Sequence, residues 1–473
     1  MEKEELVIIP APGAGHIVST IEFAKRLLER DQRLSITVLV ISHHFFKTSQ
    51  TQQLSSVPDS NIRFIHLPQA ENPPKELLKS GEKYLSVYIE NHKSLVKESI
   101  INHVSSKSKP LLGLVIDMFC TSMIDVANEL NVPSYVFFTS SAAFLGFVLY
   151  LPVHYSKFGT ELSPSDPDLI ISTFANTIPT NVLPSFAFNK DGGYETFLYH
   201  ANRIKETKGI FTNTFAELES HTIKALARDI GTPPIYRIGP LLNLETQIHS
   251  AISQSSRQKI LNWLNDQPNS SVIFLCFGSY GGFQRPQIAE IATALEKSGQ
   301  RFLWSIRRPM AKDPHMTPEY TDFLEVLPEG FFERTKNRGL VCGWAQQVEI
   351  LAHEAVGGFV SHCGWNSILE SVWFGVPIST WPIYAEQQTN AFQLVKELEL
   401  AVELRLDYRS ENDDKIVMAD EIEKAIMSLM DAENPVRKRV REMSKKSRNA
   451  VAEGGSSFIS IGRLIEDMFA NRI

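Results

Sequence analysis

Cysteine is scarce in this sequence. The chain of 473 residues contains four cysteines, and no two of them form a C-x-x-C pair. Disulfide scaffolds and zinc ribbons need closely spaced cysteines, so the sequence excludes both classes. The same scarcity favours a reducing compartment, and we expect a cytoplasmic protein. The four residues are Cys120, Cys276, Cys342 and Cys363.

Two further absences concern positive charge and hydrophobic length. Lys and Arg number 47 against 54 Asp and Glu, a net charge of −7, which argues against phosphate contacts with nucleic acid. The longest apolar run, Ala142–Val153, is shorter than the about 20 residues that span a bilayer, and Leu6–Ile9 is too short for a secretion signal. We therefore expect neither a nucleic-acid partner nor stable membrane insertion.

What the first half does contain is an alternation of short strands with helical patterns. Ser35–Ser42 is nearly all apolar and β-branched, as in a strand that is covered on both faces of a parallel sheet. Strand–helix repetition of this kind predicts a doubly wound α/β layer. The expected strands are Glu5–Pro10, Ser35–Ser42, Asn61–Leu67, Leu111–Asp117, Ser134–Phe138 and Lys208–Thr212, with a helix at Thr121–Leu130.

A second series of the same kind follows a polar, Ser- and Gln-rich segment. The length of the chain favours two or three domains. We expect an N-terminal domain at 1–242, a linker at 243–258 and a C-terminal domain at 259–455, followed by an amphipathic helix at Ser457–Asn471. The second series comprises strands at Val272–Phe277, Phe302–Ile306, Leu340–Gly343, Gly358–Ser361 and Val376–Trp381, and helices at Pro286–Lys297, Val348–His353 and Ser367–Phe374.

Ligands of doubly wound sheets bind beyond the carboxyl ends of the strands, so two facing domains would form a cleft there. In the first domain, Gly13-Ala14-Gly15-His16 follows the first strand. The helix dipole favours a neutral His16 that can accept a proton, and Asp117, at another strand end, can fix its tautomer. The alternatives are a histidine packed in a turn and an aspartate that satisfies loop amides. Val18 stands where a dinucleotide-binding loop needs its third glycine.

In the second domain, the segment 361–367 passes from a strand through a glycine turn into a helix. Backbone amides at such a helix start suit a phosphate, and His362, Asn366 and Ser367 add side-chain donors. The alternative is a plain capped helix, because Ser367–Glu370 has the pattern of a capping box. A second strand–Gly–Ser turn, ending at Ser279, is another candidate phosphate contact.

Other strand ends carry side chains suited to a base and a sugar. Trp344 can stack a planar base, although most buried tryptophans only fill a core. Glu386 and Gln387 can bond sugar hydroxyls, with a solvated helix start as the alternative.

Together these residues resemble a known family. The 44 residues Trp344–Gln387 (WAQQVEILAHEAVGGFVSHCGWNSILESVWFGVPISTWPIYAEQ) resemble the signature box of plant UDP-sugar-dependent glycosyltransferases of small molecules. The segments PAPGAGH, LVIDMFC, IYRIGPL and FLCFGS look like further family landmarks. Two residues depart from the family pattern, which commonly has Pro at the position of Gln346 and often has Pro at that of Glu354. These departures bear on the stiffness of the loop beside Trp344.

The resemblance implies a GT-B fold, with two facing Rossmann-like domains and mainly parallel sheets. It also implies that a last helix, at about 456–473, packs back on the N-terminal domain. By the same likeness, the donor contacts are Trp344 and Ala345 for uracil, Gln347 and Glu370 for ribose, Ser279, His362, Asn366 and Ser367 for diphosphate, and Thr139, Trp365, Glu386 and Gln387 for the sugar.

The activity implied is inverting transfer of glucose from UDP-glucose to a hydroxyl of a flavonoid, another phenolic or a terpenoid, by a monomer that uses no metal and no cofactor. His16 would be the general base, oriented by Asp117, and Gln387 resembles the glucose-using members; UDP-xylose is the alternative donor. Phe119, Phe144 and Tyr384 would line the acceptor pocket. Two other classes stay open: a nicotinamide-dependent oxidoreductase and a nucleotide-sugar binder without catalysis.

Overall fold

The computed structural model describes residues 3–43, 62–104, 110–229, 231–244, 254–309, 319–320, 322–410 and 415–472. The chain divides into two compact units. The first unit comprises Met1–Thr180, Ser185–Asn243 and Asn449–Ile473, and the second comprises Asn181–Pro184 and Leu244–Arg448. Most of the predicted linker, at 245–253, and the first residue of the predicted strand Asn61–Leu67 lie outside the described residues.

The first unit is built on a parallel sheet, which has seven strands within the described residues, in the order β3-β2-β1-β4-β5-β6-β7. The order reverses between β1 and β4, where Ile9 pairs with Ile116. Such a reversal is the place where doubly wound sheets bind ligands. The strands are β1 (Glu4–Ile9), β2 (Leu34–Val40), β3 (Ile62–His66), β4 (Leu111–Asp117), β5 (Ser134–Phe138), β6 (Ile210–Thr212) and β7 (Ile235–Arg237).

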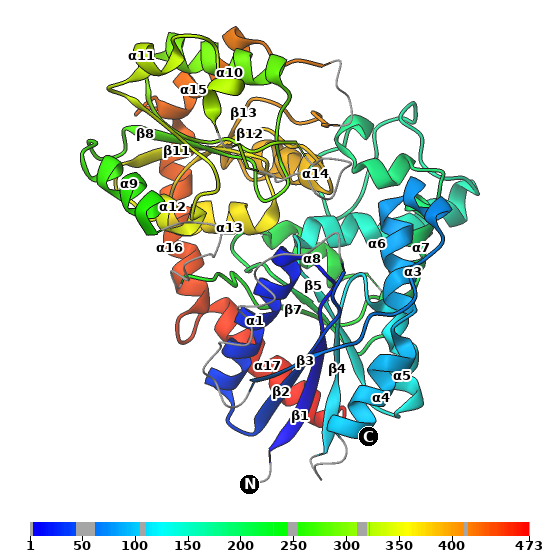
Figure 1. Cartoon of the computed structure of the whole chain (residues 1–473). Helices are drawn as coiled ribbons and strands as arrows, with labels where there is room; N and C mark the ends of the chain where they lie inside the picture. Colours follow the sequence, from blue (N-terminus) through cyan, green and yellow to red (C-terminus); the bar gives the residue numbers. More distant parts are fainter. Residues whose placement is uncertain are drawn as a thin grey trace. The chain divides into compact units, whose positions relative to one another are not determined.

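Helices cover both faces of this sheet. Figure 1 shows α1 on one side of the strands and α4 and α5 on the other. The sheet is therefore buried on both faces, and every residue of β2 is buried, as the apolar pattern of that strand predicts. The helices of the first unit are α1 (Ala14–Arg30), α3 (Gly81–Glu90), α4 (Lys93–His103), α5 (Ile124–Glu129), α6 (Ala142–Phe158), α7 (Gly193–Ile204), α8 (Ser220–Leu226) and α17 (Ser456–Ala470), with short 3₁₀ turns at η3 (Lys75–Lys79), η5 (Thr121–Met123), η6 (Thr180–Val182) and η7 (Ser185–Phe188).

The apolar run Ala142–Val153 forms most of α6. Most of its side chains are buried, so the run is a core helix of the first unit, as its length predicts. The helix ends at Gly159, whose positive φ of 68° suits the left-handed C-cap position. Among the helices in the described part of the chain, none is long and apolar enough to cross a membrane.

The second unit repeats the topology of the first. Its parallel sheet has six strands within the described residues, in the order β10-β9-β8-β11-β12-β13, and the order reverses between β8 and β11. In Figure 1, α10 and α15 lie on one side of these strands and α12 and α13 on the other. The strands are β8 (Val272–Cys276), β9 (Arg301–Ser305), β10 (Gly339–Cys342), β11 (Val356–Ser361), β12 (Ile378–Thr380) and β13 (Ala401–Glu403).

The three helices predicted in the second unit are present as α10, α12 and α13, and the other helices of this unit were not predicted. The helices of the second unit are α9 (Gln254–Asn265), α10 (Arg285–Ser298), α11 (Phe331–Thr335), α12 (Gln347–Leu351), α13 (Trp365–Phe374), α14 (Gln387–Phe392), α15 (Ala419–Met430) and α16 (Pro435–Val451), with a 3₁₀ turn η8 (Phe323–Glu325) and a π-helical turn η9 (Gln393–Glu397). Helix α9 begins at Gln254, inside the predicted linker, because its residues Ile260 and Leu264 bury against the second unit.

A four-residue segment from the first half of the chain, Asn181–Pro184, belongs to the second unit. The Thr389 hydroxyl donates to the Val182 carbonyl at 2.9 Å, and the Arg409 guanidinium donates to the Leu183 carbonyl. The boundary expected at residue 242 therefore misses an earlier excursion of the chain into the second unit.

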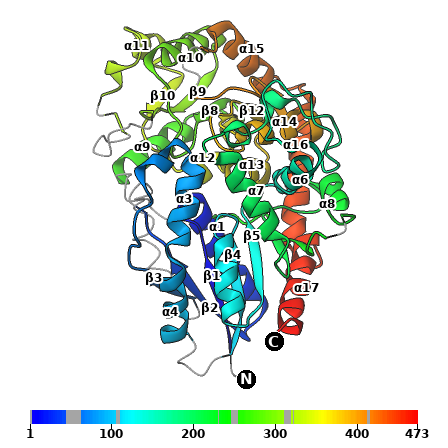
Figure 2. The ribbon, with the colours of Figure 1, turned by 90° about the vertical axis from the view of Figure 1, so that its right-hand side faces the viewer.

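The chain returns to the first unit at Asn449, within α16, and ends in α17. Figure 2 shows α17, in red, alongside the strands of the first unit, where it packs against β7, β4 and α1. The Tyr236 hydroxyl donates to Asp467 at 2.6 Å, and Arg30 lies 3.5 Å from the centroid of the Phe458 ring. The final helix is thus part of the core of the first unit.

Candidate functional site

The order reversal of the first sheet brings a histidine and an aspartate together. Gly13, with φ 151°, turns the chain from β1 into α1, and His16 is the third residue of that helix. Asp117 is the last residue of β4. Nδ1 of His16 lies 2.7 Å from Oδ2 of Asp117, and the imidazole is 27% exposed while the carboxylate is buried. Because the carboxylate accepts a hydrogen bond from Nδ1–H, Nε2 is the ring nitrogen that can take up a proton.

The aspartate is itself held in place. The Phe119 backbone N–H donates to the second carboxylate oxygen at 3.0 Å, so both oxygens of Asp117 are engaged. Oγ1 of Thr139, just beyond β5, lies 3.1 Å from Nδ1 of His16. Thr139, which the resemblance assigns to the sugar, therefore contacts the imidazole in this structure.

Aromatic rings surround this pair. The Phe119 ring makes an edge contact with the His16 ring at 5.7 Å between centroids, and Phe119 and Phe144 both contact Phe197. The first unit thus joins two of the predicted acceptor residues in one cluster next to the histidine. Tyr384, the third, lies in the second unit, where its ring is 6.3 Å from that of His362.

The order reversal of the second sheet carries the glycine turns. A Cβ on Gly278 or on Gly364 would lie 2.5 or 2.6 Å from Nε2 of His362, so only glycine lets the imidazole sit between the two turns. Burial lowers the pKa of His362 to about 4, which keeps the ring neutral at pH 7. Its Nδ1 is buried and has no hydrogen-bond partner among the described residues.

Helix α13 begins at Trp365, and Gly364 is its N-cap with no side-chain bond. The capping-box interpretation of Ser367–Glu370 is therefore wrong, because Ser367 lies inside the first turn. Its hydroxyl instead accepts a 2.7 Å bond from Nε2 of Gln347, and the same amide donates to Glu370 at 2.6 Å. Asn366 lies half-buried beside them on this turn.

Burial raises the pKa of Glu370 to about 7, and the hydrogen bond from Gln347 works in the opposite direction. The carboxyl group therefore titrates within the physiological pH range, far above its ordinary value of 4.5. A ligand that donates hydrogen bonds to Glu370 would favour its ionised form.

Trp344 follows β10 with its side chain half-buried, and Ala345 beside it is buried. The Trp344 backbone N–H donates to Glu319 at 3.1 Å, and Glu319 in turn pairs with Arg307 at 3.4 Å. Sequence reasoning did not find Glu319, since nothing in a single sequence marks a loop carboxylate as the partner of a distant backbone amide.

Glu386 and Gln387 lie at the start of α14, after the left-handed residue Ala385 with φ 55°. Oε1 of Gln387 accepts from the backbone N–H groups of Ile383 and Tyr384 at 2.9 and 3.0 Å. These bonds fix the amide so that its NH₂ group is the end able to donate to a ligand. Trp365 is buried, and Ser279 is exposed.

Each unit thus places its predicted residues beyond the carboxyl ends of parallel strands whose order reverses in the Rossmann manner, which is the architecture of the GT-B fold. The family described as "UDP-glucoronosyl and UDP-glucosyl transferase" matches residues 16–437. The chain belongs to this family of UDP-glycosyltransferases.

Individual relatives cover almost the whole chain. UDP-glycosyltransferase 71K1 of Malus domestica is 51% identical over 99% of both chains. UDP-glucose flavonoid 3-O-glucosyltransferase 6 of Fragaria ananassa is 49% identical over 98% of both. The crystal structure of Medicago truncatula UGT71G1 complexed with UDP-glucose matches with a TM-score of 0.89 and 47% identity, covering 98% of each chain.

Proposed function

We propose that this enzyme transfers glucose from UDP-glucose to a hydroxyl of a small aromatic or apolar acceptor, such as a flavonoid, another phenolic or a terpenoid. The observation that carries the proposal is the His16–Asp117 pair at 2.7 Å, at the order reversal of the first sheet. The UDP-glucose in the Medicago structure and the flavonoid in the Fragaria relative's name support the donor and the acceptor class.

The proposed mechanism is a single inverting displacement. Nε2 of His16 takes the proton of the acceptor hydroxyl as its oxygen bonds to the anomeric carbon on the face opposite UDP. The bond from that carbon to the diphosphate oxygen breaks, and its electron pair leaves with UDP. Throughout the reaction Asp117 accepts a hydrogen bond from Nδ1–H of His16, and it stabilises the imidazolium that forms. An α-linked donor therefore gives a β-glucoside.

The second unit supplies the donor contacts of this proposal. Trp344 stacks uracil, with the Ala345 backbone at its edge, and Gln347 and Glu370 bond the ribose. Helix α13 has ten residues. Its first turn offers backbone N–H groups and the positive end of the helix dipole to the diphosphate. His362, Asn366, Ser367 and Ser279 add to this stabilisation, so that no metal and no cofactor is required.

The sugar contacts are the Trp365 backbone, Glu386 and Gln387. The fixed Gln387 amide can donate hydrogen bonds to sugar hydroxyls, and its likeness to the glucose-using members of the family supports glucose over xylose. The Thr139 oxygen lies 3.1 Å from the Nδ1 of His16 that donates to Asp117, so the Thr139 O–H group remains able to donate to the sugar.

The test is UDP release from UDP-glucose across a panel of phenols and terpenoid alcohols, with the anomeric configuration of each product read by NMR. A β-glucoside formed in the presence of EDTA is expected. An α-product, or activity lost to EDTA and restored by a divalent cation, would overturn the mechanism. NAD bound to the purified protein would instead favour the oxidoreductase class, and UDP binding without turnover the non-catalytic binder.

The proposal includes a cytoplasmic location, which the four scattered free cysteines support, and a monomeric state. Light scattering at the concentrations used for kinetics gives the mass, and a dimer would contradict it.

A further inference from the structure

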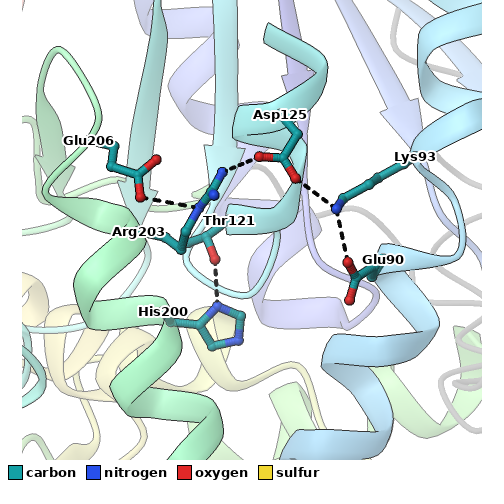
Figure 3. Close-up of polar contacts among 7 residues, drawn as sticks. All are labelled: Glu90, Lys93, Thr121, Asp125, His200, Arg203 and Glu206. Carbon is teal, nitrogen blue, oxygen red and sulfur yellow. Dashed lines mark hydrogen bonds and ion pairs between the residues drawn. The ribbon is translucent and has the colours of Figure 1, made fainter. Parts of the chain in front are cut away.

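A buried histidine near the proposed base makes only half of its possible hydrogen bonds. His200, on α7, is 2% exposed, and its Nδ1 lies 2.7 Å from the hydroxyl of Thr121, as Figure 3 shows. Its Nε2 is buried and has no hydrogen-bond partner within the part of the chain that the structure describes. Buried polar atoms are nearly always paired, so an unpaired one calls for an explanation.

The position of His200 connects it to the catalytic pair. The Phe119 ring makes edge contacts with both imidazoles, at 5.7 Å to His16 and 6.0 Å to His200. Thr121 follows Asp117 by four residues in the same turn after β4. A single aromatic ring and a single turn therefore separate the unpaired nitrogen from the base.

Ion pairs with neighbouring helices hold α7, the helix that carries His200. One helical turn along α7, Arg203 donates to Asp125 at 2.6 Å, and Lys93 donates to the other oxygen of Asp125 at 2.8 Å. Figure 3 shows this network, with Glu90 and Glu206 at its two ends, on the same side of α7 as His200. Because α7 is tied to α5 and α4, His200 cannot easily shift to find another partner.

We propose that Nε2 of His200 recognises a second polar group of the acceptor, a hydroxyl or a carbonyl remote from the hydroxyl that is glucosylated. The proposal rests on the proposed function and adds the substrate class: planar acceptors with polar groups at both ends. In this proposal the half-buried Phe119 ring, which contacts both imidazoles, turns aside so that a bound acceptor reaches Nε2.

The chemistry suits either polar group. Burial lowers the pKa of His200 to about 3, so the ring is neutral and carries one N–H. The Thr121 hydroxyl can donate to Nδ1 or accept from it, so Nε2 can donate to a carbonyl or accept from a hydroxyl. Sites built to bond a hydroxyl discriminate strongly against analogues that lack it, because the protein group stays unpaired.

The experiment compares two flavones. One has a single hydroxyl, on the ring that is glucosylated, and the other has a second hydroxyl on the opposite ring. The wild-type kcat/KM should favour the dihydroxy acceptor by roughly tenfold to a hundredfold for the same product position. His200→Phe should bring this ratio close to one, His200→Gln should restore part of it, and the KM for UDP-glucose should stay within about twofold. Tyr199→Phe, a neighbour on α7, is the matched control and should keep the wild-type ratio.

An unchanged ratio in His200→Phe, or a wild-type ratio near one, would overturn the proposal. If His200→Phe does not fold, Thr121→Val decides, because it removes the hydrogen bond that orients the His200 ring and should lower the ratio by about threefold or more. Failure of the wild type to glucosylate either flavone or any other acceptor would count against the proposed function instead.

Discussion

The proton acceptor proposed here depends on one hydrogen bond. Asp117 accepts from Nδ1 of His16 and so leaves Nε2 with the lone pair. His16→Ala should lower kcat by about 10²–10⁴-fold, the usual contribution of general-base catalysis, while UDP binding persists. Asp117→Asn should cost a similar factor, because the new amide can donate to Nδ1 and favour the wrong tautomer. Steady-state UDP release measures both variants.

Calorimetric titration with UDP is the companion measurement, since both variants should bind UDP as the wild type does. Normal turnover by His16→Ala would show that another group takes the proton. A loss of UDP binding would indicate instead that the variant is misfolded.

Glu370 makes donor binding and stability depend on pH. Its pKa of about 7 exceeds its ordinary value of 4.5, so the folded state binds a proton more tightly than the unfolded state. The resulting stability is fully present below pH 4.5 and is lost as the pH rises through 7. Glu370→Gln should therefore raise the melting temperature of the ligand-free protein by about 2–4 °C at pH 8 and by less at pH 5. Differential scanning calorimetry at the two pH values measures this.

The same ionisation should appear in the kinetics. The carboxylate accepts hydrogen bonds from ribose better than the neutral acid does, so the wild-type KM for UDP-glucose should rise as the pH falls below 7. Glu370→Gln should have a higher KM at pH 8 and a flat pH profile. Glu354→Gln, an exposed change in the same signature segment, should keep the wild-type profile; if Glu370→Gln keeps it too, Glu370 does not titrate in the donor site.

At the scale of elements, the start of α6 depends on a distant carboxylate. Glu219 is 2% exposed and accepts from the backbone N–H groups of Ala142 and Ala143, both at 2.9 Å. A negative charge there also suits the positive end of the helix. Glu219→Ala should lower the free energy of unfolding by about 2–4 kcal/mol, because two buried N–H groups lose their acceptor. Urea denaturation monitored by circular dichroism measures the change.

The matched control for this prediction is Glu217→Gln. Glu217 is exposed, and its carboxylate accepts a 2.8 Å hydrogen bond from the Ser456 hydroxyl. This variant should unfold within about 0.5 kcal/mol of the wild type. Equal denaturation midpoints for Glu219→Ala and Glu217→Gln would mean that the α6 terminus finds another partner.

Elements with strong local patterns could be predicted from the sequence. The expected strands Leu111–Asp117 and Ser134–Phe138 match β4 and β5 residue for residue, because each is a buried apolar run with clear ends. The strands β7 and β13 were both missed, because each has three residues and ends on a charged one, whereas the equally short β6 and β12 carry no charge and were predicted. The capping box failed because Ser367 bonds Gln347, a tertiary contact that overrides the local pattern.

Features that depend on tertiary contacts could not be predicted in the same way. Asn181–Pro184 joins the second unit through hydrogen bonds from Thr389 and Arg409, more than two hundred residues away. Glu219 and His200 are single polar residues in apolar surroundings, and only the structure reveals which atoms they face. His16 and Asp117 were predictable because strand ends in this topology converge.

At the scale of the whole molecule, the two units have separate hydrophobic cores. One core lies between the β8–β13 sheet and α10 and α15, and the other joins the β1–β7 sheet to α1 and α17. Large proteins with separate cores often unfold in more than one step. All proposed contacts to the uracil, the ribose and the diphosphate, from Ser279 to Glu370, belong to the second unit. A ligand stabilises the unit that binds it, so UDP should act selectively on that unit.

The distribution of tryptophan makes this selectivity measurable, because all six tryptophans lie between Trp263 and Trp381, inside the second unit. UDP at about a hundred times its dissociation constant adds about 2.7 kcal/mol, which should raise the tryptophan-fluorescence melting temperature by about 5–10 °C. The first unit has no tryptophan, so its unfolding appears in calorimetry but not in fluorescence, and the melting temperature of that transition should not change. His16→Ala should keep the full UDP shift and Trp344→Ala should lose most of it. A UDP shift of equal size in every transition would contradict this, because it would mean that the two cores unfold as a single cooperative structure.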